Sequence, residues 1–391
     1  MKQTKPIVVA VLAFVLVFGG VLLALRADRW LRARNESNPP ILGSRPGTML
    51  ANNPGPVSAA PFDFRAAAKR IMPSVVSIDA IVQRETFMGE RFLQNASSGS
   101  GVVISADGHI VTNSHVVRDS QDPTRTAAQF RITFSDGKVR EAKAVGIDIR
   151  SDLAVLKVDA KDLIPATFAD SKLLEIGEWV LAVGNPLGYA NTVSVGVVSS
   201  LNRETNGDAG STLFDAIQTD AAINQGNSGG ALCNSAGELV GINTAIASIG
   251  GGNIGIGFAI PVNRMKLVVK DILEHGYVRY AGLGLEFHPR PQLLSIPEAR
   301  AELRQLTGAS AEPPSTGLLV NNVFPGTAAA TAGLQKYDVV LSVGGTDVSD
   351  ITTYNKFILT KAPGDKVTLK VWSKGQTKDV QATLMDVGRN R

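Results

Sequence analysis

Residues 225–230 read Gln-Gly-Asn-Ser-Gly-Gly, and Ser228 is the one hydroxyl in the run. Upstream lie Thr-Asn-Ser-His, which ends at His115, and Ser-Asp-Leu-Ala, with Asp152 at its second position. A serine hydroxyl is a poor nucleophile at neutral pH, so it needs an imidazole to accept its proton and a carboxylate to orient that imidazole. The ordered set His115, Asp152 and Ser228 therefore predicts a serine protease.

The glycines of this run also have a chemical purpose. The negative oxygen of a tetrahedral intermediate is best held by rigid backbone N–H donors that no side chain obstructs. We assign these oxyanion-hole donors to Gly226 and Ser228. A tight turn in which the glycines only permit unusual backbone angles is the alternative, but it does not explain the histidine and aspartate upstream.

Length and composition limit the other possibilities. The 391 residues are enough for two domains with sizeable cores. The net charge of +4 comes from the first 36 residues, which hold six basic and two acidic side chains. The remainder is balanced, so nucleic acid is not an expected partner. Cys233 is the only cysteine, which excludes an intramolecular disulfide. Its apolar neighbours predict a buried structural thiol, and we expect no metal and no cofactor.

The N-terminal region divides into two parts. Residues 7–25 are an uncharged apolar stretch, close to the ~20 residues that cross a bilayer as a helix. This stretch runs straight into Arg26, unlike a cleaved signal peptide, so residues 1–36 are expected to be a retained membrane anchor with a basic flank. Basic residues flank both ends, so charge alone does not fix the orientation. Residues 37–61 are rich in proline and are expected to be an extended linker.

Residues 62–276 contain short β-rich runs separated by Asp-Gly and Ala-Gly turns. Many short strands with glycine-rich turns and few long helices predict a mainly β fold of antiparallel barrels. Helices are expected at 64–71 and 263–274. Strands are expected at 74–80, 101–105, 109–112, 130–134, 153–158, 179–183 and 239–244.

A second unit is expected over residues 277–388. Its predicted strands are 317–323, 338–343 and 367–373, with a helix at 351–360 between the last two. The segment 289–314 interrupts the unit, and a surface helix is predicted within it at 296–306.

At the triad residues the chain resembles the Deg/HtrA family of trypsin-like serine proteases. The likeness extends through Gly-Asn-Pro-Leu-Gly at 184–188 and Gly-Ile-Gly-Phe-Ala-Ile-Pro at 255–261. The C-terminal unit resembles a PDZ domain, on Tyr-Ala-Gly-Leu at 280–283 and Ala-Gly-Leu-Gln-Lys-Tyr-Asp-Val-Val at 332–340. The resemblance covers residues 62–388 and implies a trypsin-like double β-barrel at 62–276 followed by one PDZ domain at 277–388. With one anchor, this is the layout of the membrane-anchored DegS-like subgroup.

The sequence offers other candidates for the same roles. His109 follows an Asp-Gly turn and is expected to be a surface residue at the start of a strand. Asp148 and Asp159 are alternatives to Asp152, but the family pattern Ser-Asp-Leu-Ala selects Asp152, and Asp148 is expected to be a solvated turn residue.

Residues near the nucleophile bear on activation and specificity. In trypsin-like enzymes made as inactive precursors, an aspartate at the position of Asn227 pairs with a new N-terminus. An amide cannot form that ion pair, so activation by propeptide removal is not expected. Ala222 stands where a trypsin has the carboxylate that selects Lys or Arg. The substrate pocket is expected to consist of Ala222, Thr244 and the bulky Ile246. Such a pocket is short, which predicts cleavage after small aliphatic residues. Packing of Ile246 in the core is the alternative.

In the PDZ unit, a strand near 283–287 and the helix at 351–360 are expected to border a groove. An extended peptide would enter it as an extra strand, and the loop of Tyr280, Ala281, Gly282 and Leu283 would hold its terminal carboxylate. A PDZ fold that only packs against the protease is the alternative.

The resemblance also implies how the parts combine. It implies a homotrimer, anchored once in the inner membrane with the catalytic domain in the periplasm. Phe62 and Phe64 are candidate trimer contacts, and packing in the core is the alternative. C-termini of misfolded envelope proteins would bind the PDZ domain and favour an ordered oxyanion loop. The substrate would be an anti-sigma factor, cut at its first site in envelope stress signalling. A general periplasmic quality-control protease is a second interpretation, and a non-catalytic PDZ adaptor at the membrane is a third.

Overall fold

The computed structural model describes residues 63–122, 125–161, 163–186, 191–206, 212–224, 226–244 and 255–388. The expected membrane anchor, the linker and Phe62 lie outside these residues. Within the described part of the chain, no helix is long and apolar enough to span a bilayer.

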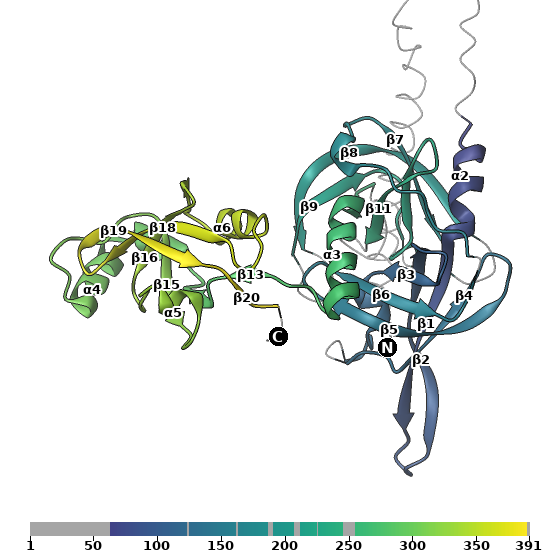
Figure 1. The fold of residues 1–391 in the computed structure, drawn as a ribbon, viewed down its shortest axis with the longest axis horizontal. Helices are drawn as coiled ribbons and strands as arrows, with labels where there is room; N and C mark the ends of the chain where they lie inside the picture. The colour runs from purple at the N-terminus through teal and green to yellow at the C-terminus, as the bar shows by residue number, and fades with distance from the viewer. Residues whose placement is uncertain are drawn as a thin grey trace, which may run out of the picture. The chain divides into compact units, whose positions relative to one another are not determined.

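Six antiparallel strands close the first barrel in the order β1-β2-β3-β6-β5-β4 (Figure 1). Alternate residues of these strands point inward, and their aliphatic side chains fill the interior. The strands are β1 Val75–Glu85, β2 Arg91–Val103, β3 His109–Thr112, β4 Gln129–Thr133, β5 Val139–Asp148 and β6 Leu153–Val158.

Six further strands close a second barrel in the order β10-β11-β12-β9-β8-β7. The predicted antiparallel β-barrels are therefore confirmed. The strands are β7 Trp179–Gly184, β8 Thr192–Asn206, β9 Thr212–Thr219, β10 Ala231–Asn234, β11 Leu239–Thr244 and β12 Gly257–Pro261.

Few helices accompany the barrels. The α2 helix, Arg65–Ile71, and the α3 helix, Val262–His275, match the two predicted ones. One face of α3 is buried in a core that also contains side chains of both barrels, and the helix lies across β5, β6 and β11 (Figure 1). It ends at Gly276, whose φ of +82° favours glycine. The short helices are η1 Met72–Ser74, η2 Ser114–Val117 and η3 Ser171–Leu173.

The remaining residues form a separate sheet with its own core. Five strands run in the order β14-β15-β16-β18-β19, β17 pairs with β16, and β13 pairs with β20. The strands are β13 Ala281–Gly282, β14 Leu285–Phe287, β15 Leu318–Val323, β16 Val339–Val343, β17 Thr346–Asp347, β18 Lys366–Ser373, β19 Gln376–Thr383 and β20 Met385–Asp386. The helices are η5 Pro291–Ser295, α4 Pro297–Thr307, α5 Ala328–Thr331 and α6 Ile351–Ile358.

Candidate active site

Asp152 lies at the end of the four-residue loop that joins β5 to β6. Its backbone has a φ of +53°, which is rare for a residue with a side chain. Its side chain is buried from solvent, and both carboxylate oxygens accept hydrogen bonds. Ser114 Oγ donates to Oδ1 over 2.9 Å. The backbone N–H of His115 donates to the same oxygen over 3.2 Å. A buried carboxylate with this many donors is held in one orientation.

His115 is carried by the short helix η2 and meets Asp152 directly. Its Nδ1 lies 2.9 Å from Asp152 Oδ2 and 3.1 Å from Oδ1. Because an ionised carboxylate can only accept, Nδ1 carries the proton and Nε2 is left as the acceptor. Asn113 anchors the same segment by donating its amide to the carbonyl of Asp152 over 3.0 Å. The histidine and aspartate predicted from the sequence are therefore in contact.

The turn that contains Ser228 packs against the strands that lead to His115. The carbonyl of Ser228 accepts the backbone N–H of Ser100 over 2.8 Å. A Cβ atom at Gly229 would lie 2.2 Å from the Ser100 carbonyl and 2.3 Å from Thr112 Oγ1. Only glycine allows this approach, and it brings the serine of the second barrel beside the histidine segment of the first.

Thr244, at the end of β11 in the second barrel, also bonds to the carboxylate of Asp152. It is fully buried, and its hydroxyl donates to Asp152 Oδ2 over 2.9 Å. The sequence predicts Thr244 for the substrate pocket, but it did not predict the hydrogen bond from Thr244 to Asp152. Contact of Thr244 with a substrate stays a prediction, and Ile246 lies outside the described residues.

The predicted oxyanion loop has a defined conformation around Gly226. This residue has a φ of +100°, and an added Cβ would lie 2.3 Å from Pro186 Cβ. Ser100 Oγ donates to its carbonyl over 2.6 Å and accepts the backbone N–H of Asn185 over 2.8 Å. Neither the backbone N–H of Gly226 nor that of Ser228 donates a hydrogen bond to another residue that the structure describes. Ser100 is a supporting residue that the sequence did not indicate.

Asn227 and Ala222 belong to the same loop. Asn227 is buried, and its amide donates to the carbonyl of Ala222 over 3.4 Å. The side chain thus bonds within its own loop, and activation without propeptide removal stays a prediction. Ala222 is exposed, and its methyl group offers no charge to a basic substrate side chain.

Asp148 corrects one expectation. It was predicted to be a solvated turn residue, but it is only 8% exposed. It accepts hydrogen bonds from the backbone N–H and the hydroxyl of Ser151 and from the hydroxyl of Tyr280. The sequence could not reveal this, because Tyr280 follows 132 residues later. Cys233 is fully buried, as predicted, and His109 begins β3 with its ring beside Asp107.

The PDZ fold leaves an open sheet edge. β14 is an edge strand, and α6 lies beside it, with the rings of Phe287 and Tyr354 in edge contact at a centroid distance of 4.9 Å. Before β14, Ala281 and Leu283 are buried in the core of this unit. Tyr280 directs its hydroxyl to Asp148, and its backbone N–H donates to Asp386 Oδ1 over 3.3 Å. Contact of Tyr280 with a bound carboxylate therefore stays a prediction.

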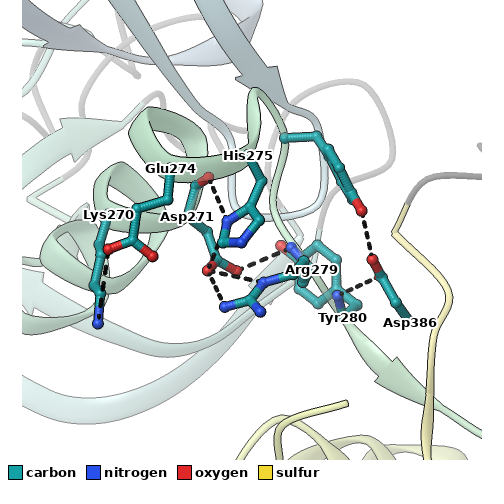
Figure 2. A network of polar contacts seen from close by, with 8 residues as sticks. Lys270, Asp271, Glu274, His275, Arg279, Tyr280 and Asp386 are labelled. Atoms are coloured by element: carbon teal, nitrogen blue, oxygen red, sulfur yellow. Dashed lines mark hydrogen bonds and ion pairs between the residues drawn. The ribbon is translucent and has the colours of Figure 1, made fainter.

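Asp271, Glu274 and His275 form a group of potential metal ligands near the end of α3 (Figure 2). Arg279 already pairs with the carboxylate of Asp271 over 2.8 Å. The charge of this carboxylate is therefore compensated by the protein itself.

Comparison with known proteins agrees with this geometry. The family model of a trypsin-like peptidase domain matches residues 99–242, and that of a PDZ domain matches residues 282–384. The solved structure of the HtrA-type protease AlgW with a decapeptide is 34% identical, with a TM-score of 0.66. The match covers 84% of this chain and 99% of that one. The chain belongs to the HtrA family of serine proteases.

Further relatives extend the comparison. The structure of a serine endoprotease from Yersinia pestis is 30% identical, with a TM-score of 0.61, over 83% of this chain and 98% of that one. Periplasmic serine endoprotease DegP of Escherichia coli is 39% identical over 295 residues, 75% of this chain. The chain spans 58% of the length of DegP and 55% of a DegP-like protein of Chlamydia trachomatis.

Proposed function

We propose that the chain is a serine endopeptidase in which Ser228 is the nucleophile, His115 the general base and Asp152 the residue that orients it. The observation that carries this proposal is the buried carboxylate of Asp152 at 2.9 Å from His115 Nδ1. With Nδ1 occupied, Nε2 takes the proton of the Ser228 hydroxyl as its oxygen attacks the scissile carbonyl, and later gives it to the leaving amine.

The oxyanion of the tetrahedral intermediate is proposed to bind the N–H groups of Gly226 and Ser228. These donors are free of other bonds to the described residues, and the bonds of Ser100 hold the loop that carries them. Preorganised donors of this kind contribute about 10²- to 10³-fold to kcat each. Water then hydrolyses the acyl-enzyme by the same proton transfers in reverse.

Specificity is proposed for small aliphatic residues before the cleaved bond. Ala222 supports it because its side chain carries no charge for Lys or Arg. Ile246 is proposed to close the pocket, and a peptide library would show the preference directly.

The PDZ unit, proposed as residues 277–388, is the site for a C-terminal peptide. The edge strand β14 supports this, since an open edge offers unpaired backbone groups to an added strand. The relative AlgW was solved with a decapeptide and with a tripeptide. We propose that hydrophobic C-termini of misfolded envelope proteins bind here and favour the active oxyanion loop by their differential affinity.

The setting is proposed from the relatives and the sequence together. Residues 1–36 would anchor the protein once in the inner membrane, with the protease domain, residues 62–276, in the periplasm, where DegP acts. A homotrimer is proposed through the region of Phe64, whose ring packs on Trp179 at a centroid distance of 5.4 Å. An anti-sigma factor of the envelope stress response is the proposed substrate.

Ser228→Ala tests the enzyme assignment. Wild-type protein should react with a fluorophosphonate probe and cleave peptides after Val or Ala, faster when a peptide with a hydrophobic C-terminus is added. The variant should lose labelling and cleavage but bind the added peptide with unchanged affinity. Unlabelled wild-type protein would refute the endopeptidase and leave the PDZ adaptor. Cleavage of unfolded casein without added peptide would favour general quality control.

A further inference from the structure

We propose that Tyr280 and Asp148 are positioning residues for the catalytic carboxylate. In this arrangement the segment between the protease and PDZ units sets the orientation of Asp152. The inference rests on the proposed function and adds to it two residues that lie outside the triad.

The first link joins Asp148 to the loop of Asp152. Asp148 is the last residue of β5, and its Oδ2 accepts the backbone N–H of Ser151 over 3.0 Å as well as the Ser151 hydroxyl. Ser151 is itself fully buried. Two bonds to one residue fix both its backbone and its side chain, so the peptide group that enters Asp152 has one orientation.

That orientation matters because Asp152 has an unfavourable backbone. A φ of +53° is avoided by residues with a Cβ atom, and only surrounding contacts maintain it. On the far side, Asn113 holds the carbonyl of Asp152. On the near side, Asp148 holds Ser151. Loss of the near-side contact would let the loop relax toward an ordinary backbone, and the carboxylate would turn away from His115.

The second link joins Asp148 to Tyr280. The ring of Tyr280 packs against the core that contains α3 and side chains of both barrels, and Arg150 lies over the ring at 4.7 Å from its centroid. Its hydroxyl donates to the same Oδ2 that holds Ser151. Burial raises the pKa of the Tyr280 phenol and the charge of Asp148 raises it further, so the hydroxyl keeps its proton and remains a donor.

The third link joins Tyr280 to the PDZ sheet through its backbone. Its N–H donates to Asp386 Oδ1 over 3.3 Å, and its carbonyl accepts the N–H of Val387 over 2.8 Å. Tyr277 donates its hydroxyl to the other oxygen of Asp386 over 2.7 Å. One residue therefore has its backbone in the β13–β20 pairing and its side chain on the loop of the catalytic aspartate.

Tyr280→Phe is the direct test, because it removes only the hydroxyl and keeps the ring and the backbone bonds. We expect kcat for a cleaved peptide to fall about threefold to tenfold with KM unchanged, the loss that corresponds to one hydrogen bond. Ser151→Ala should give a similar loss. The double variant should be little worse than either, because both changes act through Asp148.

Tyr277→Phe is the matched control, since it removes a phenolic hydroxyl from the same segment at Asp386. It should keep wild-type kcat, and all variants should bind a hydrophobic C-terminal peptide with unchanged affinity. Unchanged kcat in Tyr280→Phe, equal losses in the Tyr277 variant, or multiplicative losses in the double variant would overturn the inference. Ser151→Ala decides the matter if Tyr280→Phe does not fold. Wild-type protein that neither cleaves nor reacts with a fluorophosphonate would instead refute the proposed function.

Discussion

Replacing Thr244 by Val tests how the second barrel supports the carboxylate of Asp152, the proposed orienting residue. Val keeps the branched shape and removes the hydroxyl that bonds Asp152 Oδ2 over 2.9 Å. A buried hydrogen bond to a charged group stabilises by about 1.5–3 kcal/mol, so the free energy of unfolding should fall by that amount. For a domain of this size the melting temperature should fall by about 3–12 °C. Because the carboxylate also loses one restraint, kcat should fall about tenfold, equivalent to ~1.4 kcal/mol.

Calorimetry and peptidase kinetics on the same preparations measure both effects. Thr244→Ser is the matched control, because it retains the hydroxyl and loses only a methyl group. The serine variant should recover most of the activity and should lose about 1 kcal/mol of stability for the missing methyl. If Ser and Val variants lose equal activity, the hydroxyl has no part in holding Asp152, and packing alone explains the position.

Three further predictions concern the loop, the thiol and the PDZ helix. Gly226→Ala places a methyl group against Pro186 at a φ of +100° and should lower kcat by about 10²- to 10³-fold. The control is Gly137→Ala, where φ is +79° and no atom lies near the added carbon, and this variant should keep the wild-type kcat. Burial raises the pKa of the Cys233 thiol to about 12. A disulfide reagent at pH 8 should therefore label this thiol only in denaturant. Rapid labelling of the native protein would contradict its burial. Asp350 caps α6, and Asp350→Ala should lower the free energy of unfolding by about 1 kcal/mol, whereas Asp350→Asn should lose less. The hydrogen bond from the backbone of the helix holds the pKa of Asp350 below its usual range. The stabilisation by this cap is therefore fully present above the pKa of ~3.9 that the carboxyl has in the unfolded chain. It is lost as the pH falls through the lower pKa of the folded state. Denaturant titrations at several pH values check the sign.

The order of His115, Asp152 and Ser228 with the glycine-rich turn predicted these residues as a set, because each residue type has a chemical reason to be there. The structure places two of them in contact, with His115 Nδ1 at 2.9 Å from Asp152 Oδ2, and the catalytic roles of all three stay a prediction. The strands at 109–112 and 153–158 were predicted with their observed bounds, since short apolar runs end at clear turn residues.

Support from distant residues could not be predicted in the same way. The strands β5, β8, β9, β10 and β12 were not predicted, since their sequences contain polar or glycine positions that become strand only when a neighbour pairs with them. The bonds of Thr244 to Asp152 and of Tyr280 to Asp148 join residues 92 and 132 positions apart. Local patterns carry no information about contacts at such separations.

Division of the proposed catalytic groups between two barrels has a consequence for biosynthesis. His115 and Asp152 come from the first barrel, while Ser228 and Thr244 come from the second. In the proposed mechanism, a nascent polypeptide that has folded only its N-terminal half has no nucleophile in place, so peptidase activity begins only after both barrels have closed.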